Sequence, residues 1–445
     1  MPKHSRARAR DTAEALPVAW AWLGLATATF VWVTWLAWNG RLGLLAMGLL
    51  VVAAGTYHLG RRRMDLVGRK RLDLVAKTVF TVVGSMALLR HPIDVGGAQR
   101  LPIYQAIAQY IGEVDSRTFV IFAFVAMAVK FVGVISSAYA WHLLLVGQGL
   151  CFPFWSQIVT AFLIGRFIGT FLPSTIGLDG YTLYEASRYS NQWSRAITAK
   201  ALEKFIGITG LFLGMVLTLP FGYQVIVDVT QQLGRPAAAP ILAAAIATIG
   251  GGVSGVVLIG LVWPVLLTRL LAILGQVLPA SVRGPLDQFT QAVGAYRGQV
   301  GLLLLALFSK FMTHFTTAAV YYFTALAIGV AGAHFWPITF GSTIQILATL
   351  LSPTIAGEGA REAFQALLLS KHLGGVAQAV LSAALGFLAA EAATLWGGAF
   401  IWVRKPGWRP AFSLVDGRQV DYAWIDDDAE AGFKVSKITA AGSGQ

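Results

Sequence analysis

Long apolar stretches are the feature that most constrains how this 445-residue chain can fold. Several of them reach the roughly 20 residues that a helix needs to cross a bilayer. Charged residues make up only 12% of the chain, whereas a soluble domain carries roughly 25%. We therefore predict an all-α, polytopic helical membrane protein with about eight spans. The predicted spans are residues 17–38, 42–60, 72–90, 118–146, 195–220, 240–271, 300–331 and 376–403.

The net charge of +13 is concentrated beside these spans. Ten of the 34 Lys and Arg residues lie within residues 3–10 and 61–71. Positive charge beside a span marks the cytoplasmic side and contacts anionic lipid headgroups. The pattern favours membrane orientation over nucleic-acid binding, and predicts that both termini lie in the cytoplasm.

The spans divide the chain into four predicted segments. Residues 1–16 form a basic cytoplasmic N-terminus, and 17–116 hold accessory spans followed by an outer loop at 91–116. A short helix is expected near 104–110, and a second outer loop at 221–239. Residues 117–403 form the main transmembrane domain, and 404–445 a polar, solvated cytoplasmic tail. Span 72–90 is short and begins with charged residues, so its crossing of the membrane is left open.

Two apolar segments are too short to span. Residues 157–172 and 338–351 would be roughly 24 and 21 Å long as helices, against a hydrocarbon core of about 30 Å. Each ends at a proline, Pro173 or Pro353, and a second helical stretch follows at 181–188 or 361–370. The pattern predicts two re-entrant hairpins, each a helix, a break and a helix.

The two breaks are similar in sequence. Each reads Thr-Ile, a small residue, one further residue, an acid and Gly, at 175–180 and at 354–359. Three spans separate the hairpins, so they should enter from opposite faces, as in an inverted-repeat transporter with a central site. The glycines that should permit the tight breaks are Gly177, Gly180, Gly357 and Gly359.

At these residues the chain resembles the transmembrane region of lysylphosphatidylglycerol synthases and their stand-alone, flippase-like relatives. The first family motif matches Leu172-Pro173, Gly177, Asp179 and Gly180, followed by an acid–base pair at Glu203-Lys204. The second matches Pro353, Gly357, Gly359 and Glu362. The resemblance covers roughly residues 117–403 and implies handling of a lipid or a lipid-linked substrate.

The chain departs from the family pattern at three positions. Leu178 replaces a glycine, Tyr181 stands where an arginine often follows, and Lys204 replaces the usual arginine. The aminoacyl-transferase domain of full-length synthases is not seen in the sequence, so we do not expect lysyl transfer.

Ionisable residues within the spans are candidates for a site, because each costs at least about 2.5–3.5 kcal/mol at bilayer depth. Arg166 could bind a phosphate headgroup bidentately, or form a structural ion pair with Asp179 or Glu203. His314 and Glu391 could carry protons, or could instead be a packing residue and a helix–helix hydrogen bond. The full set is Lys130, Arg166, Glu203, Lys204, Lys310, His314 and Glu391.

The acids of the two breaks precede the second helices. Asp179 and Glu358 could cap those helices, or leave the helix N–H groups to face an anionic headgroup. Glu358, Arg361 and Glu362 lie within one turn, so an internal salt bridge is expected.

We predict translocation of a membrane phospholipid or polyprenyl-phosphate-linked lipid through a polar cavity between the hairpins. Arg166, Lys204 and Lys310 would neutralise the phosphate. A transferase using Asp179 and Glu203 as base and orienter remains an alternative, as does an accessory subunit for a glycosyltransferase or lipid-modifying partner. No catalytic motif or metal-ligand spacing occurs, and the single Cys151 excludes an intrachain disulfide, so we expect no cofactor and no metal.

Overall fold

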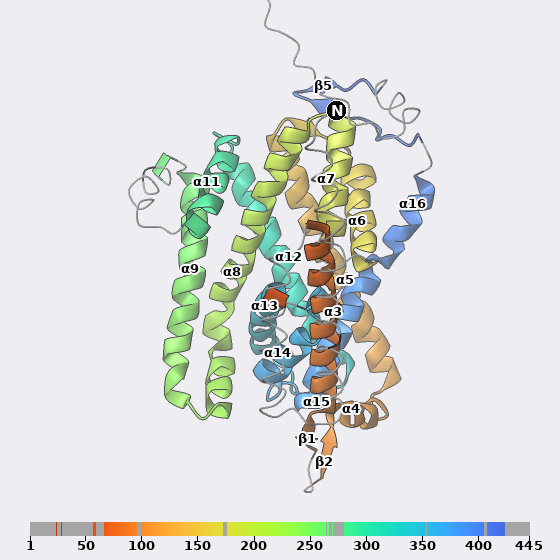
Figure 1. The fold of residues 1–445 in the computed structure, drawn as a ribbon, viewed down its shortest axis with the longest axis vertical. Helices are drawn as coiled ribbons and strands as arrows, with labels where there is room; N and C mark the ends of the chain where they lie inside the picture. Colours follow the sequence, from red (N-terminus) through yellow and green to blue (C-terminus); the bar gives the residue numbers. More distant parts are fainter. Residues whose placement is uncertain are drawn as a thin grey trace, which may run out of the picture. The chain divides into compact units, whose positions relative to one another are not determined.

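The computed structural model describes residues 24, 28, 57–58, 66–95, 99–171, 176–263, 265–266, 269, 280–352, 354–404 and 407–422. Predicted spans 17–38 and 42–60 therefore lie almost wholly outside the described residues, as do Pro173 and Pro353. Most of the described residues are helical and the strands are very short, which confirms the all-α class (Figure 1).

Six of the described helical stretches are long and apolar enough to cross a membrane. They are Gly68–Arg90, Ser116–Gly147, Trp193–Gln232, Pro236–Val262, Val300–Ala327 and Val376–Val403. Each overlaps a predicted span, so the chain is a multi-pass membrane protein. The first lies in α3 (Leu66–Arg90), whose 25 residues make a helix of about 37 Å, long enough to cross the core.

The predicted outer loop at 221–239 is wrong for most of its length. Helix α8 (Trp193–Gln232) continues through Pro220, and α9 begins at Ala239. Val225, Ile226 and Val229 are buried on this extension. Burial of these side chains outweighs the cost of a proline inside the helix.

The chain forms two compact units, each built from segments far apart in the sequence. The first takes in the described residues up to Lys130, with Gly214–Gly250 and His314–Ala390. The second takes in Phe131–Leu213, Gly251–Thr313 and the described residues from Glu391 onward. Each unit holds one of the two short helix pairs predicted from the sequence.

The short pair of the second unit consists of α6 (Thr160–Phe171), preceded by the π-helix η1 (Phe154–Val159), and α7 (Ile176–Ser190). Helices α6 and α7 run side by side (Figure 1). A Cβ on Gly177 would lie 2.5 Å from the N and Cα of Gly169, so the two backbones touch there.

This pair corrects the predicted turn glycines. Gly177 and Gly180 lie inside α7, because the helix begins at Ile176 rather than near residue 181. Residues 172–175, between α6 and α7, lie outside the described residues. Gly177 serves the close approach of two helices, whereas Gly180 is exposed and faces open space.

The short pair of the first unit consists of α13 (Phe335–Leu351), a 3₁₀ turn η3 (Ile355–Gly357) and α14 (Ala360–Leu369). Gly357 and Gly359 have φ of 73° and 77°, a left-handed backbone that glycine adopts without steric cost. Helix α3 covers this break: the Ile355 N–H donates to Thr81 Oγ1 at 2.7 Å. A backbone group freed at a break needs such a partner away from water.

The core of the second unit is aromatic and aliphatic. Trp141, Phe162, Phe289 and Tyr296 are each at most 1% exposed within it. The Tyr296 hydroxyl donates to the Leu144 carbonyl at 2.8 Å, so its polar end is satisfied inside the core. The core holds α5 (Ser116–Gly147), α8, α11 (Ala280–Gly294) and α12 (Val300–Ala327) together where they belong to this unit.

The segment after α3 contains a small hairpin. Strands β1 (Pro92–Asp94) and β2 (Arg100–Pro102) pair antiparallel, and α4 (Ile103–Ile111) follows. The short helix expected near 104–110 lies within α4, while the strands were not predicted.

The segment after α16 (Ala399–Val403) was predicted to be solvated from residue 411 onward, but part of residues 411–422 packs on the second unit instead. Strand β4 (Leu414–Val415) pairs with β3 (Leu150–Cys151) and with β5 (Arg418–Gln419). Asp416 and Gly417, with φ of 50° and 78°, make a two-residue turn of the type that suits hairpins. Trp408 and Tyr422 also pack against the core of the second unit.

An ion pair fastens this turn, and its strength should depend on pH. Arg195 Nη1 lies 2.9 and 3.0 Å from the two carboxylate oxygens of Asp416. The hydrogen bond from Arg195 holds the pKa of Asp416 below its usual range, so the pair is complete near neutral pH. Because the pKa is lowered on folding, its stabilisation is lost as the pH falls through the folded-state value.

We expect hydrogen exchange at the amides of 414–419, corrected for its intrinsic pH dependence, to accelerate on acidification. Asp416→Asn should show the faster exchange already at neutral pH, with no further step, because asparagine keeps the turn but loses the charge. Equal protection at both pH values in the unmodified protein would contradict this role.

Candidate functional site

Five charged side chains of the second unit form one chain of alternating sign, here called the charge cluster: Asp179, Lys200, Glu203, Lys204 and Lys310. Its centre is Glu203 on α8, whose oxygens lie 2.6 Å from Lys200 Nζ and 2.5 Å from Lys310 Nζ on α12. The three side chains are at most 9% exposed. Burial on this scale is tolerated because each charge has an opposite neighbour.

The cluster continues outward through Asp179 in the first turn of α7. Its carboxylate lies 3.8 Å from Lys200 Nζ and 3.2 Å from Lys204 Nζ. The side chain of Lys204 is 59% exposed, against 25% for Asp179. The cluster therefore runs from a fully buried lysine, Lys310, to one that is open to its surroundings.

Neutral groups fix the two buried lysines. Lys200 Nζ donates to Thr182 Oγ1 at 2.9 Å and lies 3.9 Å from the centre of the Trp141 ring. Lys310 Nζ donates to Ser137 Oγ at 2.8 Å. Ser137 and Glu203 thus engage two of the three N–H groups of the Lys310 ammonium.

Close packing of α8 on α12 brings Lys310 to Glu203. A Cβ on Gly210 would lie 2.8 Å from the Phe311 nitrogen and 2.9 Å from the Lys310 carbonyl carbon. Gly210 follows Glu203 by two helical turns, so both lie on the face of α8 that meets α12.

The sequence did not identify Lys200 as a site residue. Lys200 is three residues before Glu203 and four before Lys204 on a continuous helix, and this spacing was the available signal. Glu203 and Lys204 match the family motif as a pair, yet they do not pair with one another: Glu203 contacts Lys200 and Lys310, and Lys204 contacts Asp179.

Arg166 on α6 has a different partner from the two predicted. Its Nη2 lies 3.7 Å from Glu391 Oε1, and its Nε donates to Thr394 Oγ1 at 3.4 Å. Thr170 also donates to Glu391, at 2.5 Å. The partner is Glu391, rather than Asp179 or Glu203, because α6 packs against η4 (Trp396–Gly398), which directly follows α15 (Val376–Leu395).

In the first unit, Arg361 and Glu362 form the expected salt bridge at 2.7 Å. Glu362 also accepts the Gly359 N–H at 2.7 Å, and Arg361 lies 4.2 Å from the centre of the Phe387 ring. Glu358 is exposed and does not cap α14, which corrects the prediction: Gly359 precedes the helix, and the carboxylate that reaches back is that of Glu362.

Asp179 also lacks the capping position that the sequence offered, because it lies inside α7. Two further predicted residues belong to the first unit. Lys130, buried, donates to Thr317 Oγ1 at 3.0 Å, and His314 is partly buried on α12.

The structure contains a further buried ion pair that was not predicted from the sequence. Glu185 on α7 contacts Arg404 Nη1 at 2.5 Å and accepts from Gln157 Nε2 at 2.8 Å and Tyr181 at 3.1 Å. Arg404 follows α16, 219 residues away, so no local pattern could have shown the contact.

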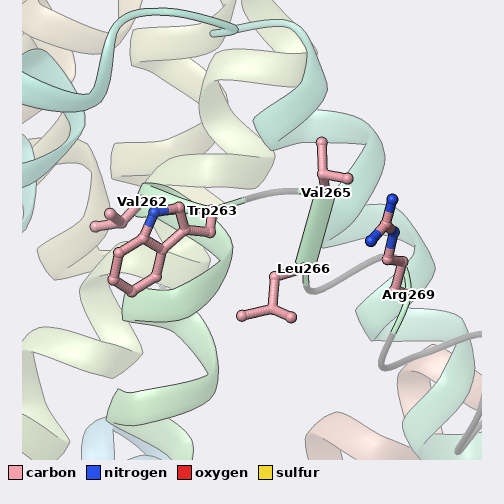
Figure 2. Close-up of a pocket in the computed structure, with 5 residues that line it drawn as sticks. All are labelled: Val262, Trp263, Val265, Leu266 and Arg269. Carbon is pink, nitrogen blue, oxygen red and sulfur yellow. The ribbon is translucent and has the colours of Figure 1, made fainter.

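A hollow of about 610 Å³ lies just beyond the end of α9 (Figure 2). Trp263 and Arg269 lie on opposite sides of it, and Val262, Val265 and Leu266 are the other described residues that line it. Its lining is mostly apolar, and no residue of the charge cluster contributes to it.

A protein-family model described as the lysylphosphatidylglycerol synthase TM region matches residues 105–398, well over half of the chain. The matched range includes both short helix pairs and every residue of the charge cluster. Neither the curated proteins nor the solved structures contain a match. The match confirms the resemblance read from the sequence, and the chain therefore belongs to the family of the lysylphosphatidylglycerol synthase TM region.

Proposed function

We propose that this protein moves a lipid with a phosphate-bearing headgroup between the leaflets of the membrane. The observation that carries the proposal is the charge cluster, in which three ammonium groups face only two carboxylates. Ionisable groups within a membrane domain are rare and mark substrate pathways, so a surplus of positive charge favours an anionic substrate.

Lys204 is the natural first contact for the phosphate. It is the most exposed member of the cluster, and a lysine binds phosphate as a point charge. A phosphate at Lys204 would compete with Asp179 for the ammonium group. Asp179 would then still have Lys200 at 3.8 Å, so the exchange leaves no carboxylate unpaired.

Arg166 and Lys310, the other two basic residues predicted to contact the phosphate, take separate roles in this proposal. Arg166 is a second phosphate ligand, since its 3.7 Å separation from Glu391 is longer than a charge-assisted hydrogen bond of about 2.7–2.9 Å. Lys310 holds Glu203 in place instead of contacting the substrate.

The proposal places the protein in a bacterial-type plasma membrane, and the Lys and Arg distribution supports a cytoplasmic location for both termini. It also treats the short helix pairs as re-entrant. Helices α7 and α14, with 15 and 10 residues, would be about 22 and 15 Å long, less than the hydrocarbon core of about 30 Å. Entry of the two pairs from opposite faces stays a prediction.

Leaflet-resolved transport of labelled lipids in proteoliposomes tests the proposal. The panel should contain an anionic phospholipid, a zwitterionic phospholipid and a polyprenyl-phosphate lipid. We expect acceleration of at least one phosphate-bearing lipid, and a roughly tenfold or greater loss in Lys204→Gln, the effect of losing about 1.5–3 kcal/mol of a charged hydrogen bond.

Lys371→Gln is the matched control. Lys371 is also an exposed lysine paired with one carboxylate, Asp228, at 3.1 Å, and it lies outside the charge cluster. Equal losses in the two variants would contradict the role of Lys204. Absence of acceleration across the whole panel would overturn the proposal, and chemical conversion of the lipid by the purified protein would indicate a transferase instead.

A further inference from the structure

A second pocket, of about 300 Å³, lies between α7 and the segment after α16. It is here called the arginine pocket, because Arg188 and Arg404 line it. Tyr181, Glu185, Tyr189 and Trp408 also contribute side chains. All of these residues belong to the second unit, and none belongs to the charge cluster.

The arginine pocket carries one surplus positive charge. Glu185 is its one lining carboxylate among the described residues, and it is taken by Arg404 Nη1 at 2.5 Å. Arg404 Nη2 is satisfied separately by the Ser156 carbonyl at 2.9 Å. Arg188 donates to the Tyr184 hydroxyl at 3.2 Å, and within the described part of the chain no carboxylate pairs with it.

Aromatic rings hold both guanidinium groups in place. Arg404 lies 3.9 Å from the centre of the Trp408 ring, and Arg188 lies 5.6 Å from that of Tyr189. Tyr189 in turn donates to the Trp408 carbonyl at 3.0 Å, which ties the two walls of the pocket together. A site so fixed loses little side-chain entropy when an anion binds.

The chain immediately before the pocket is apolar and exposed. Trp402 and Val403, the last residues of α16, are 83% and 67% exposed. They suit contact with acyl chains, and a tryptophan next to basic residues is typical of the headgroup level of a membrane. The pocket therefore lies where an apolar surface gives way to positive charge.

We propose that the arginine pocket binds a phosphate group, carried by the headgroup of an anionic phospholipid whose acyl chains lie along Trp402 and Val403. The Arg188 guanidinium donates to the phosphate oxygens, a geometry that its planar fork matches. A soluble phosphate ester offers the same chemistry. This site is separate from the transport proposal and stands or fails without it.

Native mass spectrometry of the detergent-purified full chain tests the site, with phosphatidylglycerol and phosphatidylcholine added in turn. We expect preferential retention of phosphatidylglycerol, and apparent affinity lower by about tenfold or more in Arg188→Gln. Arg195→Gln is the matched control, because this arginine is also on the second unit but contacts Asp416 outside the pocket. Arg188→Lys keeps the charge and should retain part of the affinity.

Competition with inorganic phosphate distinguishes the two sources. Displacement of phosphatidylglycerol from the wild type by inorganic phosphate, lost in Arg188→Gln, shows a site that also takes free phosphate. Failure to displace it, with the Arg188 dependence intact, shows that the lipid is the ligand. Retention of phosphatidylglycerol by Arg188→Gln at wild-type affinity, with unchanged thermal unfolding, would overturn the proposal.

Discussion

Glu203→Gln should destabilise the protein by about 3–5 kcal/mol, the cost of breaking a buried ion pair by removing one partner. Glu203 is the common partner of Lys200 and Lys310, and all three side chains are buried. Glutamine keeps the size of the side chain, so the loss measures charge rather than packing. The free energy of unfolding in mixed detergent micelles, followed by loss of helicity, gives this value.

Two further variants make the result specific. Glu113→Gln removes an exposed carboxylate and should change stability by no more than about 0.5 kcal/mol. Adding Lys310→Met to Glu203→Gln removes the ammonium group left without a carboxylate, since Lys200 keeps Asp179 at 3.8 Å, and should restore part of the loss. If Glu203→Gln unfolds with the wild-type free energy, the cluster does not hold α8 to α12.

Gly177→Ala and Gly180→Ala should change stability in opposite directions, although they lie three residues apart on α7. The new Cβ at 177 would lie 2.5 Å from the backbone of Gly169, so α6 and α7 must separate. Overpacking of this kind costs about 1–3 kcal/mol, and here no flexible side chain can yield. At 180 no atom lies within 4 Å, and alanine should stabilise the helix by up to about 1 kcal/mol.

The same unfolding measurement compares the two alanine variants directly. Because Asp179 lies between the two glycines, Gly177→Ala should also disturb the contacts of Asp179 with Lys200 and Lys204 and slow lipid transport. Equal stability of the two variants would show that α6 and α7 do not touch at Gly177.

The membrane class and the spans within the described residues were predictable because hydropathy is a local property of the sequence. The short helix pairs were also recognisable, since a run such as 338–351 is too short to cross the bilayer. The start of α7 was not, because the similarity of the two breaks suggested a long turn through Gly180. In the structure, residues 176–180 already belong to α7, whereas the matching residues 355–357 form a 3₁₀ turn.

The sequence indicated which charged residues belong to the site better than it indicated which of them form ion pairs with one another. Glu203 and Lys204 are adjacent in the sequence, but consecutive helical residues point in different directions and do not face each other. Glu203 meets Lys310, 107 positions later, and Arg166 meets Glu391 from another helix. Such contacts depend on how helices pack, which no spacing within a single helix records.

The packing of the C-terminal segment on the second unit was not predicted, for a different reason. Its composition is polar, and polarity was taken as a sign of solvation. Leu414 and Val415 are enough to form a strand against Leu150 and Cys151, and the Asp416-Gly417 turn and Arg195 fasten it. A strand of only two residues is too short to be recognised from the composition of the segment.

The hydrogen bond from Ile355 to Thr81 affects how stable a shortened form of this chain would be. The family match begins at residue 105, whereas Thr81 belongs to α3, which ends at Arg90. A chain shortened to the matched range would lose the acceptor for a backbone N–H at the second break, at a cost of several kcal/mol in a lipid environment. We therefore expect α3 to stabilise the family domain of this protein, although α3 lies outside the matched range.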